Sequence, residues 1–411
     1  MDALSYLFSL EQFGIKFGLA SIRALLARLG NPDHAFRSIH IAGTNGKGSV
    51  TAMVDSVLRR AGHRSARYTS PHLIDLSERF VVDGRAVAAA EMARAAEDVR
   101  QAIEGAIADG TLSAKPTFFE ATTAMAFDMF RRAGVEFAVI EVGLGGRLDS
   151  TNVIDPIVTA ITSIDFDHQQ YLGNTLADIA GEKAGIIKPG VPVVVGDVAP
   201  EAYGVIERIA RERGAELIRA DAAEREYGPI TLGLRGAHQV ANARVAMRVL
   251  ETLERLGVTI GRQAIVDGLT TVTWPGRLEH RTLPDGREII LDAAHNPAGA
   301  AALASYLRGL EGAGSTKPAL VFAAMRDKDV DGMLTVLLPA IGRVVVTRPS
   351  NPRAANPEEL AARIRAIAPA LPIDIVSPPA AALAAATKIS RLVVVAGSIF
   401  LLGDVMQELG A

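Results

Sequence analysis

The chain has 411 residues, of which 49% are hydrophobic and 22% are charged, and its formal net charge is -3. This length exceeds one ordinary core and predicts two or three domains, and the composition suits a compact protein with a buried interior. The charge balance argues against nucleic acid or an anionic membrane surface as a partner. The sequence contains no cysteine, which excludes disulfides, thiolate zinc sites and a cysteine nucleophile.

The N-terminal residues do not resemble a secretory signal, and the sequence does not suggest a membrane span. Residues 1–14 contain acidic side chains and lack the basic start and long apolar run of an export signal. No uncharged stretch reaches the roughly 18 to 20 apolar residues that a membrane span needs. We therefore expect a cytoplasmic protein.

The first two thirds of the chain alternate between strand and helix patterns. Apolar spacing predicts helices between residues 4 and 29, which end at Gly30-Asn31-Pro32. Strands are then expected at 39–42, 64–69, 137–142, 156–163 and 191–196, helices at 51–60, 89–108, 117–132, 175–184 and 200–213, and a hairpin around Asp83-Gly84. The alternation predicts an α/β fold with a mostly parallel sheet and helices on both faces.

The pattern begins again after Trp274-Pro275-Gly276. A hairpin with Pro284-Asp285-Gly286 at its turn leads into a strand at 289–292, and further strands are expected near 318–323, 343–347, 372–376 and 391–396, with helices between them. We place a domain boundary at about residue 272. Residues 1–271 form a larger phosphate-loop domain, and residues 272–411 form a smaller Rossmann-like α/β domain.

A glycine-rich turn joins the strand at 39–42 to the helix that follows. It contains Gly43, Thr44, Asn45, Gly46, Lys47, Gly48 and Ser49. Glycines let backbone N–H groups surround an anion, the helix N-terminus adds its dipole, Lys47 adds a charge, and Ser49 can offer a hydroxyl to magnesium. The spacing departs from the usual phosphate loop, in which four residues separate the glycines and Ser or Thr directly follows the lysine. The alternative is an ordinary strand-to-helix turn with a solvated lysine.

Polar side chains follow two other strands. Glu141 ends the strand at 137–142, and a carboxylate together with a serine hydroxyl suits magnesium. His168 follows the strand at 156–163 and could bind a second metal ion as a neutral imidazole. Each has a structural alternative, an ion pair for Glu141 and an ordinary hydrogen-bonded residue for His168. Because ligands bind at the carboxyl ends of parallel strands, these residues can converge with the phosphate loop.

Eight segments, taken together, carry a family resemblance. They are residues 43–49, 70–73, 141–152, 165–173, 181–185, 238–243, 274–279 and 292–296. In sequence and order they resemble the folylpolyglutamate synthase and dihydrofolate synthase family, which belongs to the muramyl-type amide ligases. The irregular spacing of the phosphate loop is that family's own form.

The resemblance implies ATP-dependent amide bond formation through an acyl phosphate. Residues 1–271 would form the ATP-binding ligase domain, and residues 272–411 the glutamate-ligase domain. A substrate carboxylate would attack the γ-phosphate of ATP, and the amino group of L-glutamate would then displace phosphate. The implied nucleotide contacts are Gly43, Thr44, Asn45, Gly46, Lys47, Gly48, Ser49, Asn242, Arg277 and Asp292.

The same resemblance assigns metal and catalytic roles. Ser49 and Glu141 would bind one Mg2+ and His168 a second, which makes two magnesium sites. On sequence alone Lys183 is a solvated helix lysine, but it resembles the family's carbamylated lysine, whose carbamate would be attracted to the metals. Lys47, His168, Lys183 and His295 are the expected catalytic residues.

Substrate contacts are expected on two loops and at two helix starts. Ser70, Pro71 and His72 on a polar loop, and Phe118 at the start of a helix, are candidates for the pterin side of the pocket, although Phe118 is equally suited to the core. Ser398 is a candidate contact for the incoming glutamate, or a helix N-cap. The segment around Arg147 resembles enzymes that perform both reactions, so the substrates are dihydropteroate or a reduced folate, with L-glutamate.

Three alternatives remain. The enzyme could act on folates only, without using dihydropteroate. A muramyl ligase for cell-wall peptides is disfavoured because only about forty residues precede the phosphate loop, too few for that class's nucleotide-sugar domain. A phosphate-loop switch or regulatory ATPase is disfavoured by the second domain with Asp292 and His295. We expect a monomer without nucleic-acid or membrane partners.

Overall fold

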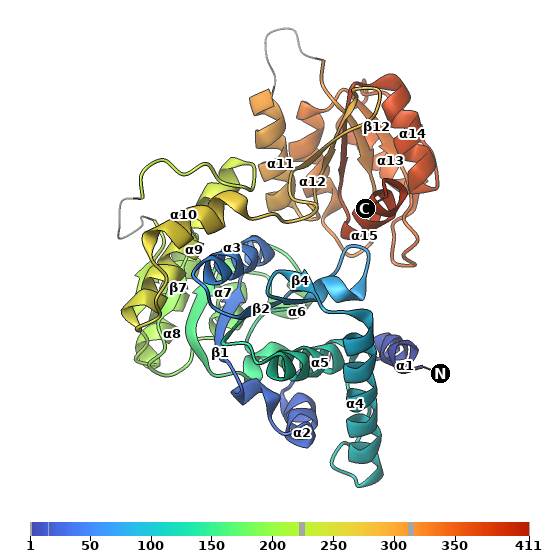
Figure 1. Cartoon of the computed structure of the whole chain (residues 1–411). Coiled ribbons are helices and arrows are strands. Elements are labelled where there is room, and N and C mark those ends of the chain that lie inside the picture. The colour runs from blue at the N-terminus through green and yellow to red at the C-terminus, as the bar shows by residue number, and fades with distance from the viewer. Residues whose placement is uncertain (1, 15, 222–226, 311–315, 411) are drawn as a thin grey trace. The chain divides into compact units, whose positions relative to one another are not determined.

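The chain folds into two compact units (Figure 1), seen in a computed structural model that describes residues 2–14, 16–221, 227–310 and 316–410. Unit 1 comprises Met1–Gly233 and Ala241–Val272, and unit 2 comprises Leu234–Val240 and Thr273–Ala411. The short segment Leu234–Val240 therefore packs with unit 2, although the residues on either side of it belong to unit 1.

In the described part of unit 1, eight strands form one sheet in the order β4-β3-β2-β5-β1-β6-β7-β8. The strands are β1 (Arg37–Ala42), β2 (Ser65–Tyr68), β3 (Phe80–Val82), β4 (Arg85–Ala86), β5 (Phe137–Glu141), β6 (Pro156–Ile161), β7 (Val193–Val195) and β8 (Leu217–Arg219). The six neighbouring strands β2, β5, β1, β6, β7 and β8 pair in parallel. At one edge of the sheet, β3 pairs antiparallel with β2 and β4 pairs antiparallel with β3. The central strand β1 lies between β5 and β6, so the loops after these three strands open at one edge of the sheet.

Helices cover both faces of this sheet. They are α1 (Ala3–Ser9), α2 (Ala20–Arg28), α3 (Lys47–Arg60), α4 (Ala89–Ala108), α5 (Phe118–Ala133), α6 (Gln169–Leu172), α7 (Leu176–Ala184), α8 (Pro200–Glu212), α9 (Ala237–Arg255) and α10 (Arg262–Thr271). Helix α3 packs on β1, β2 and β5 and against α10, whereas α5 packs on β2 and β3 together with α4. The central strands β1 and β5 are buried along most of their length, as expected for a parallel sheet covered on both faces.

Local sequence explains where two site-bearing helices begin. Thr117 caps α5 and Thr175 caps α7, each by accepting a backbone N–H three residues later, and the side chain at that third position returns the bond. Such reciprocal capping boxes satisfy donors that a helix N-terminus otherwise leaves unpaired. The capping boxes therefore fix the residues at which α5 and α7 begin.

In the described part of unit 2, six strands form a second sheet in the order β13-β12-β11-β14-β10-β9. The strands are β9 (Glu279–Thr282), β10 (Glu288–Leu291), β11 (Ala319–Phe322), β12 (Arg343–Val346), β13 (Ile373–Ile375) and β14 (Leu392–Ala396), and the helices are α11 (Pro297–Leu310), α12 (Val330–Leu337), α13 (Pro357–Ile367), α14 (Pro379–Ile389) and α15 (Ile399–Glu408). Only β9 is antiparallel to its neighbour, and it forms the predicted hairpin with β10. Figure 1 shows helices on both sides of this sheet.

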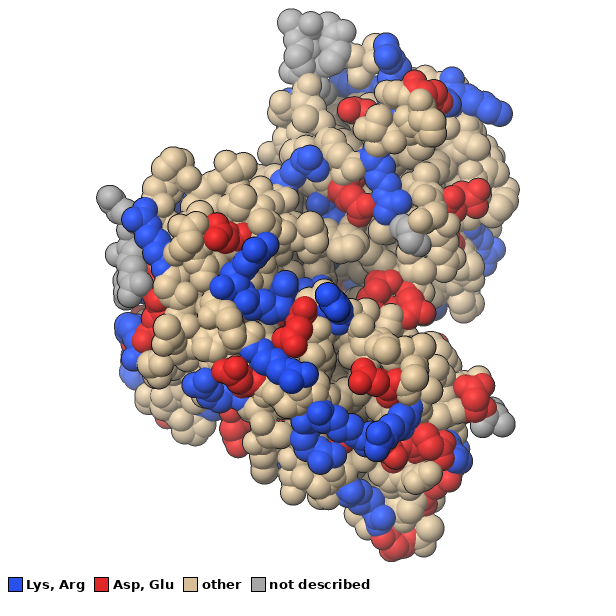
Figure 2. Space-filling model, viewed as in Figure 1, with Lys and Arg blue, Asp and Glu red and all other residues tan. Residues whose placement is uncertain are grey.

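The structure confirms the predicted α/β fold with a large, mostly parallel first sheet and a second α/β sheet. Strand β8 and helices α6, α9 and α10 were not predicted. None of the helices in the described ranges is long and apolar enough to cross a membrane. Acidic and basic side chains are interspersed on the face shown in Figure 2, in keeping with the small net charge.

Candidate active site

The phosphate loop connects β1 to α3 through two glycines with positive φ. Gly43 has φ +150° and Gly46 has φ +84°, a region in which L side chains are strained. A Cβ atom on Gly46 would also collide with the side-chain oxygen of Asn242 on α9, within unit 1. The ammonium of Lys47 folds back over the loop and donates to the carbonyl oxygens of Gly43 (3.0 Å) and Thr44 (3.2 Å). The loop is therefore shaped for close approach of a ligand to its backbone.

Hydrogen bonds fasten this loop to the segment that follows β6. The N–H of Thr44 donates to the carbonyl oxygen of Ser163 (2.8 Å), and the N–H of Asn45 donates to the Ser163 hydroxyl oxygen (3.0 Å). The Thr44 hydroxyl accepts the N–H of Asp165 (3.0 Å), and the Thr162 hydroxyl donates to the carbonyl oxygen of Asn45 (2.6 Å). The loop and residues 162–165 thus behave as one rigid piece, and His168 lies three residues beyond it.

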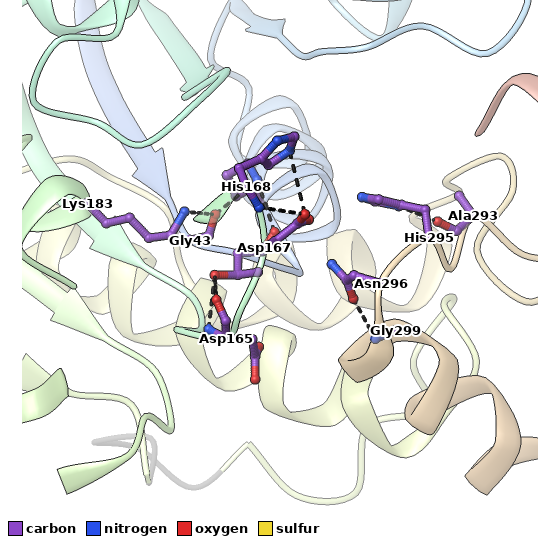
Figure 3. Close-up of polar contacts among 11 residues, drawn as sticks. Gly43, Asp165, Asp167, His168, Lys183, Ala293, His295, Asn296 and Gly299 are labelled. Atoms are coloured by element: carbon purple, nitrogen blue, oxygen red, sulfur yellow. Dashed lines mark hydrogen bonds and ion pairs between the residues drawn. The ribbon is translucent and has the colours of Figure 1, made fainter. Parts of the chain in front are cut away.

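Lys183, in the last turn of α7, reaches the phosphate loop from the other side. Its Nζ donates to the Gly43 carbonyl oxygen at 2.9 Å (Figure 3), and the residue is only 4% exposed. Burial, and next the positive charge of Lys47, lower the pKa of Lys183 to about 7, against the opposing influence of Asp167, Asp149 and Asp165. A large fraction of this amine is therefore neutral near pH 7, so it can act as a nucleophile.

The three predicted metal ligands are Ser49, Glu141 and His168. They lie close to the carboxyl ends of β1, β5 and β6, respectively. Ser49 lies in the first turn of α3 and is buried, and Glu141 ends β5, where its carboxylate accepts the N–H of Ser70 at 3.2 Å. His168 has φ +51°, and its backbone N–H donates to the Asp167 carboxylate at 2.9 Å (Figure 3). Within the described ranges, no three acidic, histidine or cysteine side chains gather around one point. The Ser49 hydroxyl and the Glu141 carboxylate nevertheless fit Mg2+, which takes few protein ligands and keeps water and phosphate oxygens.

Asp149 holds the loop that follows Glu141. Its buried carboxylate accepts the N–H groups of Leu144 (2.8 Å) and Thr151 (3.0 Å) and the Thr151 hydroxyl, while burial raises its pKa. The same hydroxyl oxygen lies 2.8 Å from Nε2 of His40, whose pKa burial lowers to about 3. Since the hydroxyl hydrogen points to Asp149, neutral His40 must donate from Nε2. This buried chain of bonds fixes the loop beside Glu141.

Arg147 lies on the outside of that loop. Its guanidinium is exposed and pairs with the Glu182 carboxylate of α7 at 2.7 Å. Gly185 allows the Arg147 backbone to pack closely against the end of α7, because a Cβ there would collide with it. The arginine thus joins the loop to the helix that carries Lys183.

The candidate pterin residues meet through an arginine that the sequence analysis did not single out. Nε of Arg79 donates to Nδ1 of His72 at 2.9 Å, and the Arg79 guanidinium carbon lies 5.3 Å from the centroid of the Phe118 ring. Ser70, two residues before His72, contacts Glu141. Arg79 is buried, although it stands just before strand β3. The only sequence signal for it is its place directly after the Asp75-x-x-Glu78 capping pattern.

In unit 2 the predicted residues surround the carboxyl ends of β10 and β14. The buried Asp292 carboxylate accepts the N–H groups of Leu278 (2.9 Å) and Ala294 (3.0 Å); burial raises its pKa, and the charge of Arg277 opposes this. Nδ1 of His295 lies 2.8 Å from the Ala293 carbonyl oxygen (Figure 3), which places the hydrogen on Nδ1.

Ser398 follows β14 in the same unit and caps α15. Its hydroxyl oxygen accepts the N–H of Phe400 at 3.2 Å, and the residue is almost fully buried. The preceding Gly397 donates its N–H to the carbonyl oxygen of Ala294 at 2.9 Å, so the serine lies beside the His295 loop. Unit 2 therefore gathers Arg277, Asp292, His295 and Ser398 at one edge of its sheet.

Comparison with known proteins gives a consistent result over both units. The Mur ligase middle domain family matches residues 41–195, and the family described as Mur ligase, glutamate ligase domain matches residues 276–399. The chain is 37% identical over 355 residues to the dihydrofolate synthase/folylpolyglutamate synthase of Bacillus subtilis (strain 168), covering 81% of each protein.

Solved structures resemble the whole chain. Mycobacterium tuberculosis folylpolyglutamate synthase complexed with ADP and AMPPCP has a TM-score of 0.89 and 34% identity, covering 100% of this chain and 99% of that one. A bifunctional folylpolyglutamate synthase/dihydrofolate synthase with Mn, AMPPNP and L-glutamate bound has a TM-score of 0.87 and 29% identity, covering 100% and 98%.

Proposed function

Because the chain belongs to the folylpolyglutamate synthase and dihydrofolate synthase family of Mur-type ligases, we propose that it joins L-glutamate to dihydropteroate and to folates at the expense of ATP. It is an ATP-dependent amide ligase. The observation that carries the proposal is the buried Lys183 amine against the phosphate loop, an arrangement that a simple phosphate-loop ATPase does not need.

The first step makes an acyl phosphate. A carboxylate oxygen of the pteroyl acid attacks the γ-phosphorus of ATP, the bond to the β,γ-bridging oxygen breaks, and ADP leaves with that electron pair. The backbone N–H groups of Gly43–Ser49 and the N-terminus of α3 hold the phosphates, and Lys47 turns from the loop carbonyls to a phosphate oxygen. Holding these groups in line supplies proximity and charge stabilisation, which are the main needs of phosphoryl transfer.

The second step forms the amide. The amino nitrogen of L-glutamate attacks the carbonyl carbon of the acyl phosphate, and the tetrahedral intermediate expels inorganic phosphate. His295 carries its hydrogen on Nδ1, so Nε2 is the nitrogen that can take the proton lost by the amine. We assign Asp292 and Arg277 to the nucleotide, and Ser398 to the incoming glutamate. Exclusion of water protects the acyl phosphate from hydrolysis.

The oxygen donors of Ser49 and Glu141 fit magnesium. Ser49 and Glu141 would hold one ion and His168 a second, and the ions would neutralise the phosphate oxygens. The Ser70 amide orients the Glu141 carboxylate, and Oδ1 of Asp167 lies 3.8 Å from Nε2 of His168. Such supporting bonds keep ligand side chains in place before the ion arrives.

Lys183 is proposed to be carbamylated. Its neutral amine attacks CO2, which forms an N–C bond and releases one proton, and the product is an anionic carbamate. The pKa of about 7 supports this, because a neutral amine is required and the ammonium form cannot react. A negative group at this position suits the neighbouring Lys47 better than a second ammonium does.

The remaining expectations belong to the same proposal. Unit 1 is assigned to ATP and unit 2 to glutamate. The protein is proposed to act as a cytoplasmic monomer without nucleic-acid partners. Arg147 is proposed to mark a bifunctional enzyme through the loop that it joins to α7.

Phosphate release tests the ligase against the ATPase alternative. With ATP and magnesium, release is expected only when both L-glutamate and a pteroyl acid are present. Equal release without either acceptor would contradict the proposal. Substitution Lys183→Ala is expected to remove amide formation while leaving ADP binding, measured by calorimetry, within about threefold.

A further inference from the structure

The segment from Ser70 to Arg79 is organised by its own side chains. The Glu78 carboxylate accepts three backbone N–H groups, those of Leu73, Ile74 and Asp75, each at 2.7 Å. Asp75 in turn caps the short 3₁₀ turn η3 (Leu76–Arg79). The loop therefore holds its shape without a ligand, so a side chain on it can be aimed before substrate arrives.

The Arg79 side chain packs between this loop and Phe118 of α5. It is 8% exposed, its Nε donates to Nδ1 of His72, and its guanidinium lies over the Phe118 ring. Burial lowers the pKa of Arg79, with Tyr68 as the first opposing influence. An arginine nonetheless stays charged and has only donor groups. Its contact with His72 therefore dictates which imidazole nitrogen carries the hydrogen.

The bond from Arg79 determines which ring nitrogen of His72 carries the hydrogen. Because Arg79 only donates, Nδ1 of His72 must accept, and the hydrogen of the neutral ring lies on Nε2. A protonated ring would set two N–H groups against each other. Burial and then Arg79 lower the pKa of His72, whereas Glu78 and Asp75 act in the opposite direction. Among the described residues, no hydrogen-bond partner of Nε2 is found, so this N–H is available to a ligand.

We propose that Arg79 is a positioning residue that holds His72 as the Nε2–H tautomer, and that His72 thereby donates a hydrogen bond to an acceptor oxygen of the pteroyl acid. His72 is half-buried, so an acceptor can approach its Nε2 from the solvent side, whereas Phe118 is a core residue that stacks on Phe8 and supports Arg79. Ser70 on the same loop contacts Glu141, so the substrate and metal residues share one support. This inference rests on the proposed ligase function and adds a specific donor to it.

Substitutions of His72 test the donor. His72→Leu removes it and is expected to raise KM for the pteroyl acid about 10- to 100-fold, with KM for ATP and kcat within about threefold. His72→Gln keeps an N–H near the position of Nε2 and is expected to restore KM to within about threefold. An unchanged KM in His72→Leu, or equal damage in both variants, would overturn the assignment.

The tautomer is tested separately by 15N NMR of the His72 ring. The protein is expected to show the Nε2–H pattern, whereas Arg79→Met is expected to show a mixture of both tautomers and a raised KM for the pteroyl acid. Arg85→Met, an exposed arginine on β4, is the matched control and should change neither. An Nδ1–H pattern in the unsubstituted protein would refute the role of Arg79. The NMR measurement needs no turnover, so it tests the tautomer even if the ligase proposal fails. Failure of the ligase proposal would appear separately, as the absence of glutamyl product from the unsubstituted enzyme.

Discussion

Replacement of Lys183 by methionine is expected to stabilise unit 1 while abolishing catalysis. Burial moves the pKa of this amine from 10.5 to about 7, which costs roughly 4 kcal/mol of folding free energy at pH 7, since one pKa unit is about 1.4 kcal/mol. The variant also loses the bond to the Gly43 carbonyl oxygen, worth about 1 kcal/mol. Lys183→Met should therefore be more stable by about 3 kcal/mol near pH 7.

The sign of the pH dependence follows from proton binding. Between about pH 7 and pH 10.5 the unfolded chain binds more protons at Lys183 than the folded one, so wild-type stability rises with pH. Near pH 10 the cost falls to roughly 1 kcal/mol and cancels the lost hydrogen bond. The advantage of Lys183→Met should therefore vanish there.

Calorimetry in CO2-free buffer measures both effects. For a domain of this size, 3 kcal/mol corresponds to a rise in Tm of roughly 6–12 °C near pH 7. Lys115→Met, an exposed lysine in unit 1, is the control and should leave Tm almost unchanged. A lower Tm for Lys183→Met near pH 7, or a difference that does not shrink by pH 10, would refute the reasoning.

Three further changes, with Gly62→Ala as a control for the first, test the phosphate loop and the metal site. Gly46→Ala places a side chain where φ is positive and where its Cβ collides with Asn242. The Kd for ADP, measured by calorimetry, should therefore rise more than tenfold. Gly62→Ala carries similar backbone strain with open space around it, so it should lose about 1 kcal/mol of stability but bind ADP normally. Ser163→Ala removes the hydroxyl that accepts the N–H of Asn45 and donates to the Asn45 carbonyl oxygen, and should raise KM for ATP about three- to tenfold with little change in kcat; an unaltered KM would count against the loop's dependence on this hydroxyl. Glu141→Gln keeps an acceptor oxygen but loses the charge, so activity should require at least about tenfold more magnesium, and an unchanged magnesium dependence would remove it from the metal site.

Some of the site follows directly from sequence physics. Glycine at 43 and 46 indicated a turn with unusual backbone angles, and both residues adopt positive φ. The strand patterns placed Glu141 at a carboxyl end beside β1, because parallel strands bring such ends together. These features can be predicted because they depend on short-range sequence patterns and because alternating strands and helices allow only a few topologies.

Other features depend on contacts that the sequence does not express. A lysine on a helix indicates a solvated group, yet Lys183 is buried and donates to the Gly43 carbonyl oxygen, a residue 140 positions earlier in the chain. In the sequence, Arg79 is only a charged residue at the start of a strand pattern. Its role depends on its contacts with His72 in the folded loop and with Phe118 in α5. Local periodicity cannot reveal either arrangement, since both require the tertiary structure.

Product analysis by mass spectrometry tests the central claim most directly. The enzyme would be incubated with ATP, magnesium and labelled L-glutamate, and dihydropteroate and tetrahydrofolate would be offered separately. We predict glutamate incorporation into both acids, with each product formed only in the presence of ATP. Incorporation into tetrahydrofolate alone would contradict the bifunctional assignment, and incorporation into neither would contradict the ligase function itself.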